Sequence, residues 1–144
     1  MSKTVKILLG IVVIGLLAAL MVYFFIYNKP HTNYEKAKTD VEITAENLYQ
    51  SYVNDQSNAE QTFNGKVIEV TGKLDGLEEV EEMVIAVFAL SEGMFGKEGI
   101  RCTMLPNHQE TVRSMKSGDM ITLKGFCAGF SGSDVIMEEC SVIQ

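Results

Sequence analysis

An uninterrupted apolar segment near the N-terminus limits how much of the chain can form a water-soluble domain. No charged residue occurs from Ile7 to Tyr27, and most side chains there are Leu, Ile, Val, Ala or Phe. Because a helix rises about 1.5 Å per residue, the run is long enough to cross a hydrocarbon core of roughly 30 Å. It predicts that residues 1–27 are a membrane anchor and that the folded domain follows it.

Two features distinguish this run from a cleaved signal peptide. A signal peptide has an apolar core of about 7 to 15 residues followed by a site of small residues. Here the run is longer, and it ends in the bulky residues VYFFIY. No cysteine follows it closely, which argues against lipoprotein cleavage. We therefore expect an uncleaved transmembrane helix that makes this a single-pass membrane protein.

The charges beside the run give only a weak preference for orientation. Lys3 and Lys6 precede it, whereas Lys29, Lys36 and Lys38 follow it, so the positive-inside count is nearly balanced. A short basic head before a first span usually stays in the cytoplasm. We therefore expect the helix in the inner (cytoplasmic) membrane, with the domain on the periplasmic, extracytoplasmic side.

The part of the chain after the anchor is acidic. The chain has 12 Lys and Arg against 19 Asp and Glu, a formal net charge of −7. Two of the lysines and none of the acidic residues precede the apolar run, so the remainder is more acidic than the whole. Such a domain repels a phosphate backbone, and nucleic acid is therefore not the expected partner.

The rest of the sequence is typical of a small β domain. Residues 28–43 are polar and aperiodic, which predicts a linker before a domain over 44–144. Thr44 is expected to cap a helix. The apolar residues of that helix fall on one face: Ala45, Leu48, Tyr49, Tyr52 and Val53. Strands are predicted over residues 66–74, 83–90, 100–105, 119–127 and 135–143, with a short helix between the third and the fourth.

Two of these strands carry an interior glycine on the face that they bury. Ile68, Val70 and Leu74 alternate onto one face, where Gly72 leaves a gap, and Gly125 occupies the matching place in a later strand. Glycine weakens a strand unless the strand bends sharply or another backbone approaches it. Small barrels need such bends. With the element order, the glycines predict a mainly β fold, a five-stranded OB-fold Greek-key barrel with a preceding α-helix.

The same segments resemble a known family. The resemblance lies in ENLYQSYVNDQSNAEQTFNGKVIEVTGKL, IRCTML, SGDMITLKGFCAGF and VIMEECSVI, including the G-x-C and C-x-V endings of the last two strands. Together they resemble the tRNA_anti-like family of small bacterial OB-fold proteins, over roughly residues 44–144. The resemblance implies an OB barrel behind a helix. It brings no catalytic or binding residues with it.

OB folds usually bind ligands on the face of strands 2 and 3 and on the adjoining loops. The loop predicted over residues 75–82 is rich in carboxylates: Glu78, Glu79, Glu81 and Glu82. These would favour a basic partner or a weakly held cation, although a solvated acidic turn that protects a strand edge is the alternative. Further candidates are Phe88 and Arg101 on the face and Met94 and Phe95 on a loop over 91–99. That loop can present a docking point or fold over the barrel end.

The chain has three cysteines, none in a C-x-x-C pair. Counting outward from the last hairpin places Cys127 and Cys140 nearly opposite, with a bulge at Glu138–Glu139 able to change the register. We predict a disulfide between them. Pairing of Cys102 with Cys140, or three buried thiols, are the alternatives. The histidines are not spaced with the cysteines as zinc ligands, so neither a metal nor a cofactor is expected.

The sequence favours a binding role over catalysis. No Ser, His and Asp pattern and no phosphate-binding glycine loop is recognisable, so we do not expect an enzyme. The main hypothesis is a membrane-tethered, extracytoplasmic binding or assembly module for a protein or another envelope component. The alternative is an oligonucleotide-binding OB domain on the cytoplasmic side, which would need aromatic platforms in a basic groove.

Overall fold

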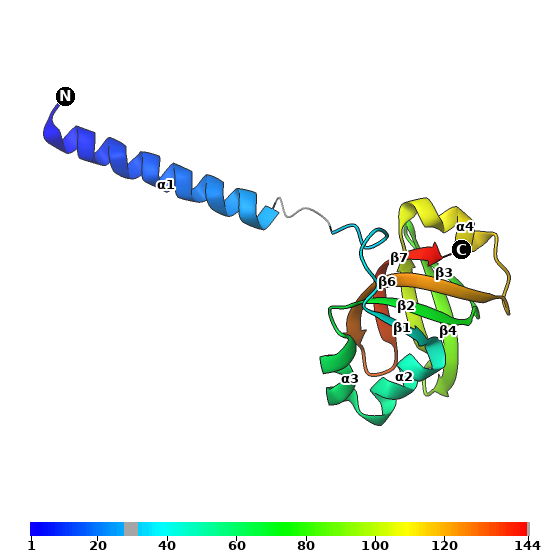
Figure 1. Cartoon of the computed structure of the whole chain (residues 1–144). Coiled ribbons are helices and arrows are strands. Elements are labelled where there is room, and N and C mark those ends of the chain that lie inside the picture. The colour runs from blue at the N-terminus through cyan, green and yellow to red at the C-terminus, as the bar shows by residue number, and fades with distance from the viewer. Residues whose placement is uncertain (28–31, 144) are drawn as a thin grey trace. The chain divides into compact units, whose positions relative to one another are not determined.

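The computed structural model describes residues 1–27 and 32–143 (Figure 1). The chain divides into two compact units, the second of which begins at Asn33. The first contains one helix, α1 (Lys3–Tyr27), whose 25 residues are all exposed. This helix is long and apolar enough to cross a membrane. The N-terminal apolar helix predicted from the sequence is therefore present.

The second unit is mostly β-sheet. Its elements, in chain order, are β1 (Val41–Thr44), α2 (Ala45–Asn54), α3 (Gln56–Phe63), β2 (Val67–Lys73), β3 (Gly76–Val80), β4 (Met83–Gly93), β5 (Gly96–Met104), η1 (Pro106–His108), α4 (Gln109–Arg113), β6 (Met120–Phe130) and β7 (Val135–Ile143). The seven strands form one sheet in the order β1-β2-β6-β7-β5-β4-β3. In Figure 1, α2 and α3 lie at one end of this sheet and α4 at the other.

The predicted number of strands, five, is wrong, because the sheet has seven. One extra strand arises where the chain changes neighbours after Leu74. Up to Lys73 the chain pairs with β6, and from Gly76 it pairs with β4, with the N–H of Asp75 donating to the oxygen of Val87 at 2.9 Å. The predicted loop 75–82 is therefore largely the strand β3.

The other extra strand, β1, lies at the end of the segment predicted as a linker. β1 pairs in parallel with β2. Before it, the ring of Tyr34 packs on Phe126 with centroids 5.0 Å apart, and Asp40 hydrogen-bonds to both backbone polar groups of Val67. The folded unit therefore begins earlier than the predicted boundary at Thr44. Residues 28–31 of the predicted linker lie outside the described residues.

The helix predicted after Thr44 is present as α2. The Thr44 hydroxyl accepts a hydrogen bond from the Asn47 N–H at 3.3 Å, so it caps the helix as expected. Four of the five predicted inward residues are buried: Ala45, Leu48, Tyr49 and Tyr52. The fifth, Val53, is 52% exposed, because it lies beside the last residue of α2 and the chain turns there into α3.

Both strand glycines allow a close approach. A Cβ built on Gly72 would lie 2.6 Å from the Cβ of Ala45 and 3.0 Å from the Phe88 ring. A Cβ on Gly125 would lie 2.5 Å from the Cys140 sulfur. The gaps in the two buried faces are therefore filled by α2 and β4 in one strand and by β7 in the other.

Candidate binding surface

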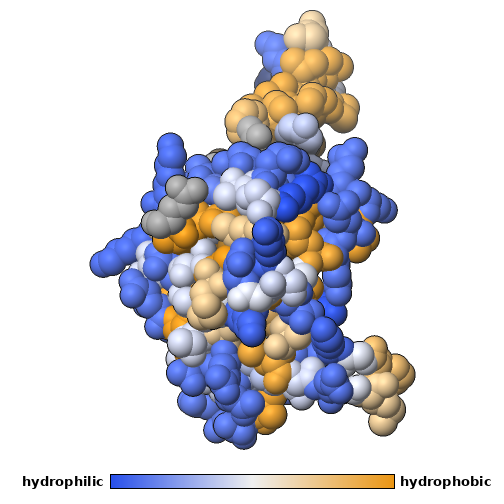
Figure 2. Space-filling view, turned by 90° about the vertical axis from the view of Figure 1, so that its right-hand side faces the viewer, coloured by the Kyte–Doolittle hydropathy of each residue, from blue (hydrophilic) through white to orange (hydrophobic). Residues whose placement is uncertain are grey.

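A shallow hollow of about 350 Å³ lies on the surface formed by β3, β4 and β5. Its lining mixes charged and apolar side chains: Asp75, Gly76, Leu77, Glu78, Val87, Phe95, Lys97 and Arg101. We call these residues the β3–β5 hollow. Figure 2 views the domain from the side on which β3 and β4 lie in Figure 1, and shows a largely hydrophilic surface with smaller hydrophobic groups between.

The hairpin turn beside the β3–β5 hollow carries the most exposed apolar side chains of the domain's described residues. Met94 and Phe95 form the turn between β4 and β5 and are 90% and 99% exposed. Gly96, which follows them, has φ of +126°, a backbone conformation that favours glycine. The predicted loop 91–99 is thus a long hairpin with a tight turn. It presents its two apolar residues to solvent and does not fold them over the domain.

The cations of the β3–β5 hollow are already paired with carboxylates. Lys97 Nζ lies 3.0 Å from Asp75, and Arg101 lies 3.1 Å from Glu78 and 3.3 Å from Asp134. Asp134 also accepts from the Gly99 N–H at 2.9 Å, which ties the β6–β7 turn to β5. The hollow is therefore close to charge-neutral and does not form a basic groove.

The acidic residues predicted for binding are partly engaged within the domain. Glu78 pairs with Arg101, and Glu79 accepts from Arg113 of α4 at 3.0 Å. The hydrogen bond to Glu79 raises the pKa of Arg113. Glu81 and Glu82 form the β3–β4 turn and are exposed, with φ of 55° at Glu81. Only these last two fit the predicted picture of carboxylates available to a partner.

Phe88 does not lie on the ligand face as predicted. It is fully buried against Gly72, because β4 is covered on both sides and its apolar residues could not be assigned to one face from the sequence. Phe126 packs on Tyr34, and Phe130 stacks on Tyr52 at 5.4 Å between ring centroids. Of the two phenylalanines predicted for the site, Phe95 is therefore the one presented to solvent.

The predicted Cys127–Cys140 bridge is absent. All three cysteines are free and fully buried. The bulge expected near Glu138 and Glu139 is present. A second irregularity, between Cys127 and Gly129, places Cys127 opposite Met137, not Cys140. Burial raises the pKa of both the Cys127 and the Cys140 thiols. Cys102 lies beside them on β5.

A polar cluster that the sequence did not reveal holds the start of the domain in place. His108 Nε2 lies 2.6 Å from Glu35, and its Nδ1 accepts from the Val142 N–H at 3.2 Å. The hydrogen bond from His108 lowers the pKa of Glu35. Lys124 donates to the Glu35 carbonyl oxygen at 3.3 Å. Because Glu35 lies in the segment predicted as a linker, nothing in the sequence pointed to this contact.

Within residues 1–27 and 32–143, no group of three His, Cys, Asp or Glu side chains could hold a metal ion.

The architecture defines a class of protein: a mostly β domain with an OB-like fold behind an N-terminal apolar helix. The sequence matches the tRNA_anti-like family over residues 1–142, and the chain belongs to that family. The match includes the apolar helix, whereas the resemblance seen in the sequence began near residue 44.

One of the solved structures similar to this chain shares its fold at low sequence identity, and others match with lower scores. A structure from Klebsiella pneumoniae, described as a putative nucleic acid-binding lipoprotein, has a TM-score of 0.55 at 12% identity and covers 81% of this chain and 100% of its own. The Stn1–Ten1 complex of S. pombe gives 0.40 at 14% identity, over 54% of this chain and 58% of its own. Asparaginyl-tRNA synthetase from Pyrococcus horikoshii gives 0.39 at 15%, over 58% of this chain and 20% of its own. No curated protein matches the sequence.

Proposed function

We propose that this protein is a membrane-tethered binding or assembly module that engages a protein or another envelope component and performs no catalysis. The observation that carries the proposal is the hairpin turn of Met94 and Phe95, both almost fully exposed, with Phe95 lining the β3–β5 hollow. Burying one such side chain contributes about 1.5 to 3 kcal/mol, and aromatic residues with arginine are the common anchors of protein interfaces.

The proposed location is the inner (cytoplasmic) membrane, with the domain on the extracytoplasmic side. The length and composition of α1 support an anchor, and the short basic head with Lys3 and Lys6 supports this orientation. The description of the Klebsiella pneumoniae structure as a lipoprotein offers a parallel for the same fold at a membrane.

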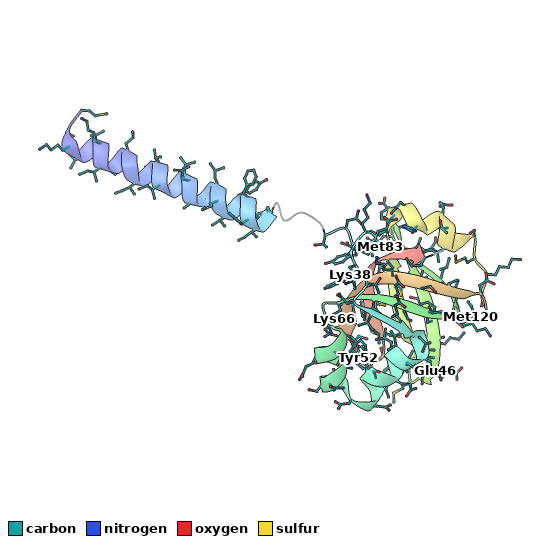
Figure 3. The ribbon with its side chains drawn as sticks, in the orientation of Figure 1. Lys38, Glu46, Tyr52, Lys66, Met83 and Met120 are labelled. Atoms are coloured by element: carbon teal, nitrogen blue, oxygen red, sulfur yellow. The ribbon has the colours of Figure 1, made fainter. Side chains whose placement is uncertain are left out.

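Site-specific photo-crosslinking in native membranes tests the proposal. A benzoylphenylalanine replaces Phe95 in the full chain, and the products are identified by mass spectrometry. Met120 serves as the matched control position, because it is also apolar and exposed, at 68%, and lies at the start of β6 (Figure 3). We expect one defined partner at position 95 that position 120 does not capture.

The partner identified in this way must also depend on the native surface. In a purified binding assay, Phe95→Ala and Met94→Ala should each weaken the partner about tenfold, whereas Met120→Ala should not. Equal capture at both positions, or equal affinities of all three variants, would remove the β3–β5 hollow as the binding surface. Glu81→Gln with Glu82→Gln tests the acidic turn separately, and an unchanged affinity would leave that turn a solubility feature.

Oligonucleotide binding on the cytoplasmic side is the second candidate. It is favoured by the placement of Phe95, Lys97 and Arg101 around one hollow and by the description of the Klebsiella pneumoniae structure. The ion pairs of both cations oppose it. Titration of the detergent-solubilised full chain with labelled single-stranded DNA and RNA at physiological salt decides between the two candidate functions. Binding that falls steeply with salt and is lost in Lys97→Ala would replace the protein-binding proposal.

A further inference from the structure

We propose that the outer edge of β3 pairs with an extended, basic segment of a partner protein, which adds a strand to the sheet. β3 is the last strand of the sheet order, and within residues 1–27 and 32–143 it is paired with β4 alone. An unpaired strand edge presents backbone N–H and C=O groups to which a further strand can bond. This inference rests on the proposed function, because it names the kind of segment that the partner presents.

The register of the β3–β4 hairpin indicates which backbone groups of β3 face outward. The two residues after Val80 form the turn, and Val80 pairs with Met83 across it. The pair that closes such a turn is hydrogen-bonded, and hydrogen-bonded pairs alternate with non-bonded pairs along an antiparallel ladder. Counting back from Val80, the N–H and C=O groups of Leu77 and Glu79 therefore point away from β4.

This edge of β3 is accessible to solvent. The last three of its five residues are exposed and the first two are half-buried. Where α4 reaches the hairpin, its side chains contact other groups: Arg113 donates to the Glu79 carboxylate at 3.0 Å, and Gln109 donates to the Glu82 carbonyl oxygen at 3.1 Å. The strand at the opposite end of the sheet order, β1, has four residues and runs directly into α2, so it offers a shorter edge.

The charge along this edge favours a basic occupant. Carboxylates are concentrated at the end of the hairpin: Glu78, Glu79, Glu81 and Glu82. Arg101 and Arg113 pair with the first two, whereas the last two are exposed at the turn. Lysine or arginine side chains on an added strand would lie beside these carboxylates, and opposite charges on neighbouring strands stabilise their pairing.

The same charge disfavours a second copy of this chain as the occupant. Two β3 edges paired about a two-fold axis would place the glutamates of one copy beside those of the other, and like charges in such positions are destabilising. The net charge of −7 on each chain adds to the repulsion. Charged side chains commonly protect strand edges from self-association. Here they are all of one sign, so they leave the edge available to a basic segment.

An added strand would also extend the surface of the β3–β5 hollow. Gly76, Glu78 and Val80 alternate onto one face of β3, and the first two line the hollow. Val80 is 49% exposed, and Met83, its neighbour across the hairpin, is 45% exposed (Figure 3). Every second side chain of the added strand lies on this face. One partner segment can therefore use its backbone at the edge and its side chains at the hollow.

Peptide binding to the full chain in a non-ionic detergent tests the proposal. The probe is a fluorescently labelled peptide of about ten residues in which lysine alternates with threonine, and in the first control glutamate replaces lysine. The second control keeps the lysines but carries N-methyl groups on two adjacent central residues, which blocks hydrogen bonding at both of its edges. At physiological salt we expect the basic peptide to bind at least about tenfold more tightly than either control.

Two substitutions at one position separate backbone pairing from charge. Glu79→Ala and Glu79→Pro both remove the carboxylate, but proline also removes an N–H group that points away from β4, so the β3–β4 ladder is retained. Glu79→Pro should weaken binding of the basic peptide about tenfold relative to Glu79→Ala, with the same circular dichroism. Glu81→Gln with Glu82→Gln should weaken it roughly threefold to tenfold.

The three peptides are compared on the native chain, so a variant that fails to fold does not leave the question open. Equal binding of the basic and N-methylated peptides, or no binding of the basic peptide at about 1 mM, would overturn the proposal. A dimer in sedimentation velocity that Glu79→Pro dissociates would also overturn it, because the occupant would then be a second copy.

The peptide assay and the crosslinking experiment can fail separately. Capture of a partner at position 95 without binding of the basic peptide would overturn the edge proposal alone. Binding of the basic peptide with equal capture at positions 95 and 120 would support the edge and remove the β3–β5 hollow as the binding surface.

Discussion

The packing around Gly72 allows the effect of one methyl group to be worked out. In Gly72→Ala, the new Cβ would meet the Cβ of Ala45 at 2.6 Å and the Phe88 ring at 3.0 and 3.2 Å. Ala45 begins α2 and has no flexible end that could move aside, and Phe88 is fully buried. The overlap must therefore be relieved by shifting α2 or β4 against the sheet.

Two opposing contributions determine how much Gly72→Ala changes the free energy of unfolding. Overpacking of a core costs about 1 to 3 kcal/mol. The loss of unfolded-state freedom from glycine to alanine returns roughly 0.4 to 1 kcal/mol. We therefore expect Gly72→Ala to lower the free energy of unfolding by about 1 to 2 kcal/mol, and the melting temperature by roughly 4 to 8 °C.

Gly76→Ala is the matched control, because a Cβ there meets no atom within 4 Å and its φ lies outside the left-handed region. It should leave stability unchanged or raise it by about 0.5 kcal/mol. Both variants are compared by urea unfolding followed by circular dichroism, with Ala45→Gly added to Gly72→Ala as a double mutant. Equal stabilities of the two alanine variants, or no coupling in the double mutant, would refute the close-approach explanation of this glycine.

Three further perturbations test contacts on other faces of the domain. Thr44→Ala removes the cap of α2 and should cost about 1 kcal/mol in urea unfolding; a loss below about 0.3 kcal/mol would contradict the cap. The hydrogen bond from His108 lowers the pKa of Glu35 in the folded domain below its ordinary value of 4.5. The stability that the ionised Glu35 contributes is therefore present above pH 4.5 and is lost as the pH falls through the lower, folded-state pKa. Glu35→Gln should therefore flatten the acid limb of melting temperature against pH, and parallel curves would exclude that contribution. Tyr52→Phe removes the hydroxyl bonded to Asn64 and should cost about 1 to 2 kcal/mol by the same urea assay, whereas native stability would show the bond to be dispensable.

The parts of the fold that could be predicted are those in which a pattern of residues corresponds to a single structural environment, such as one buried face. The helix α2 is amphipathic, begins at a capping threonine and buries one face, so its period and its cap agree. In β2, Ile68 and Val70 are fully buried while Lys73 is exposed, which is the alternation seen in the sequence. Gly72 was informative because a gap in such a row needs a neighbour to fill it.

The strands that were missed lack such a pattern. β3 pairs only with β4, and its residues Glu78, Glu79 and Val80 are all exposed, so neither of its faces stands out as apolar. β1 has only four residues, too few for an alternation to be recognised. β1 is held by hydrogen bonds to β2, far along the chain, and β3 by a tight hairpin with β4. Sequence periodicity reports neither set of bonds.

The prediction of the candidate site was correct in outline but wrong in part, for similar reasons. Phe95 was singled out as an apolar residue on a predicted loop, and it is exposed. Phe88 was misplaced because a strand covered on both sides has no alternation that separates a core face from a ligand face. Counting residues outward from the β6–β7 turn could not locate Cys140, because two irregularities interrupt the register on the way.

The contacts already made within the β3–β5 hollow indicate which of its residues can contribute most free energy to the binding of a partner. A phosphate that takes the Arg101 N–H groups now bonded to carboxylates would displace Glu78 and Asp134. The side chain of Asp134 is only 13% exposed, so its displacement would leave a poorly solvated carboxylate beside a second anion. Phe95 is 99% exposed and has no comparable contact to lose. The free energy gained by burying its ring is therefore nearly all available for binding. For this reason an apolar contact at the hairpin turn is the expected centre of an interface, with the paired charges of Lys97 and Arg101 at its rim.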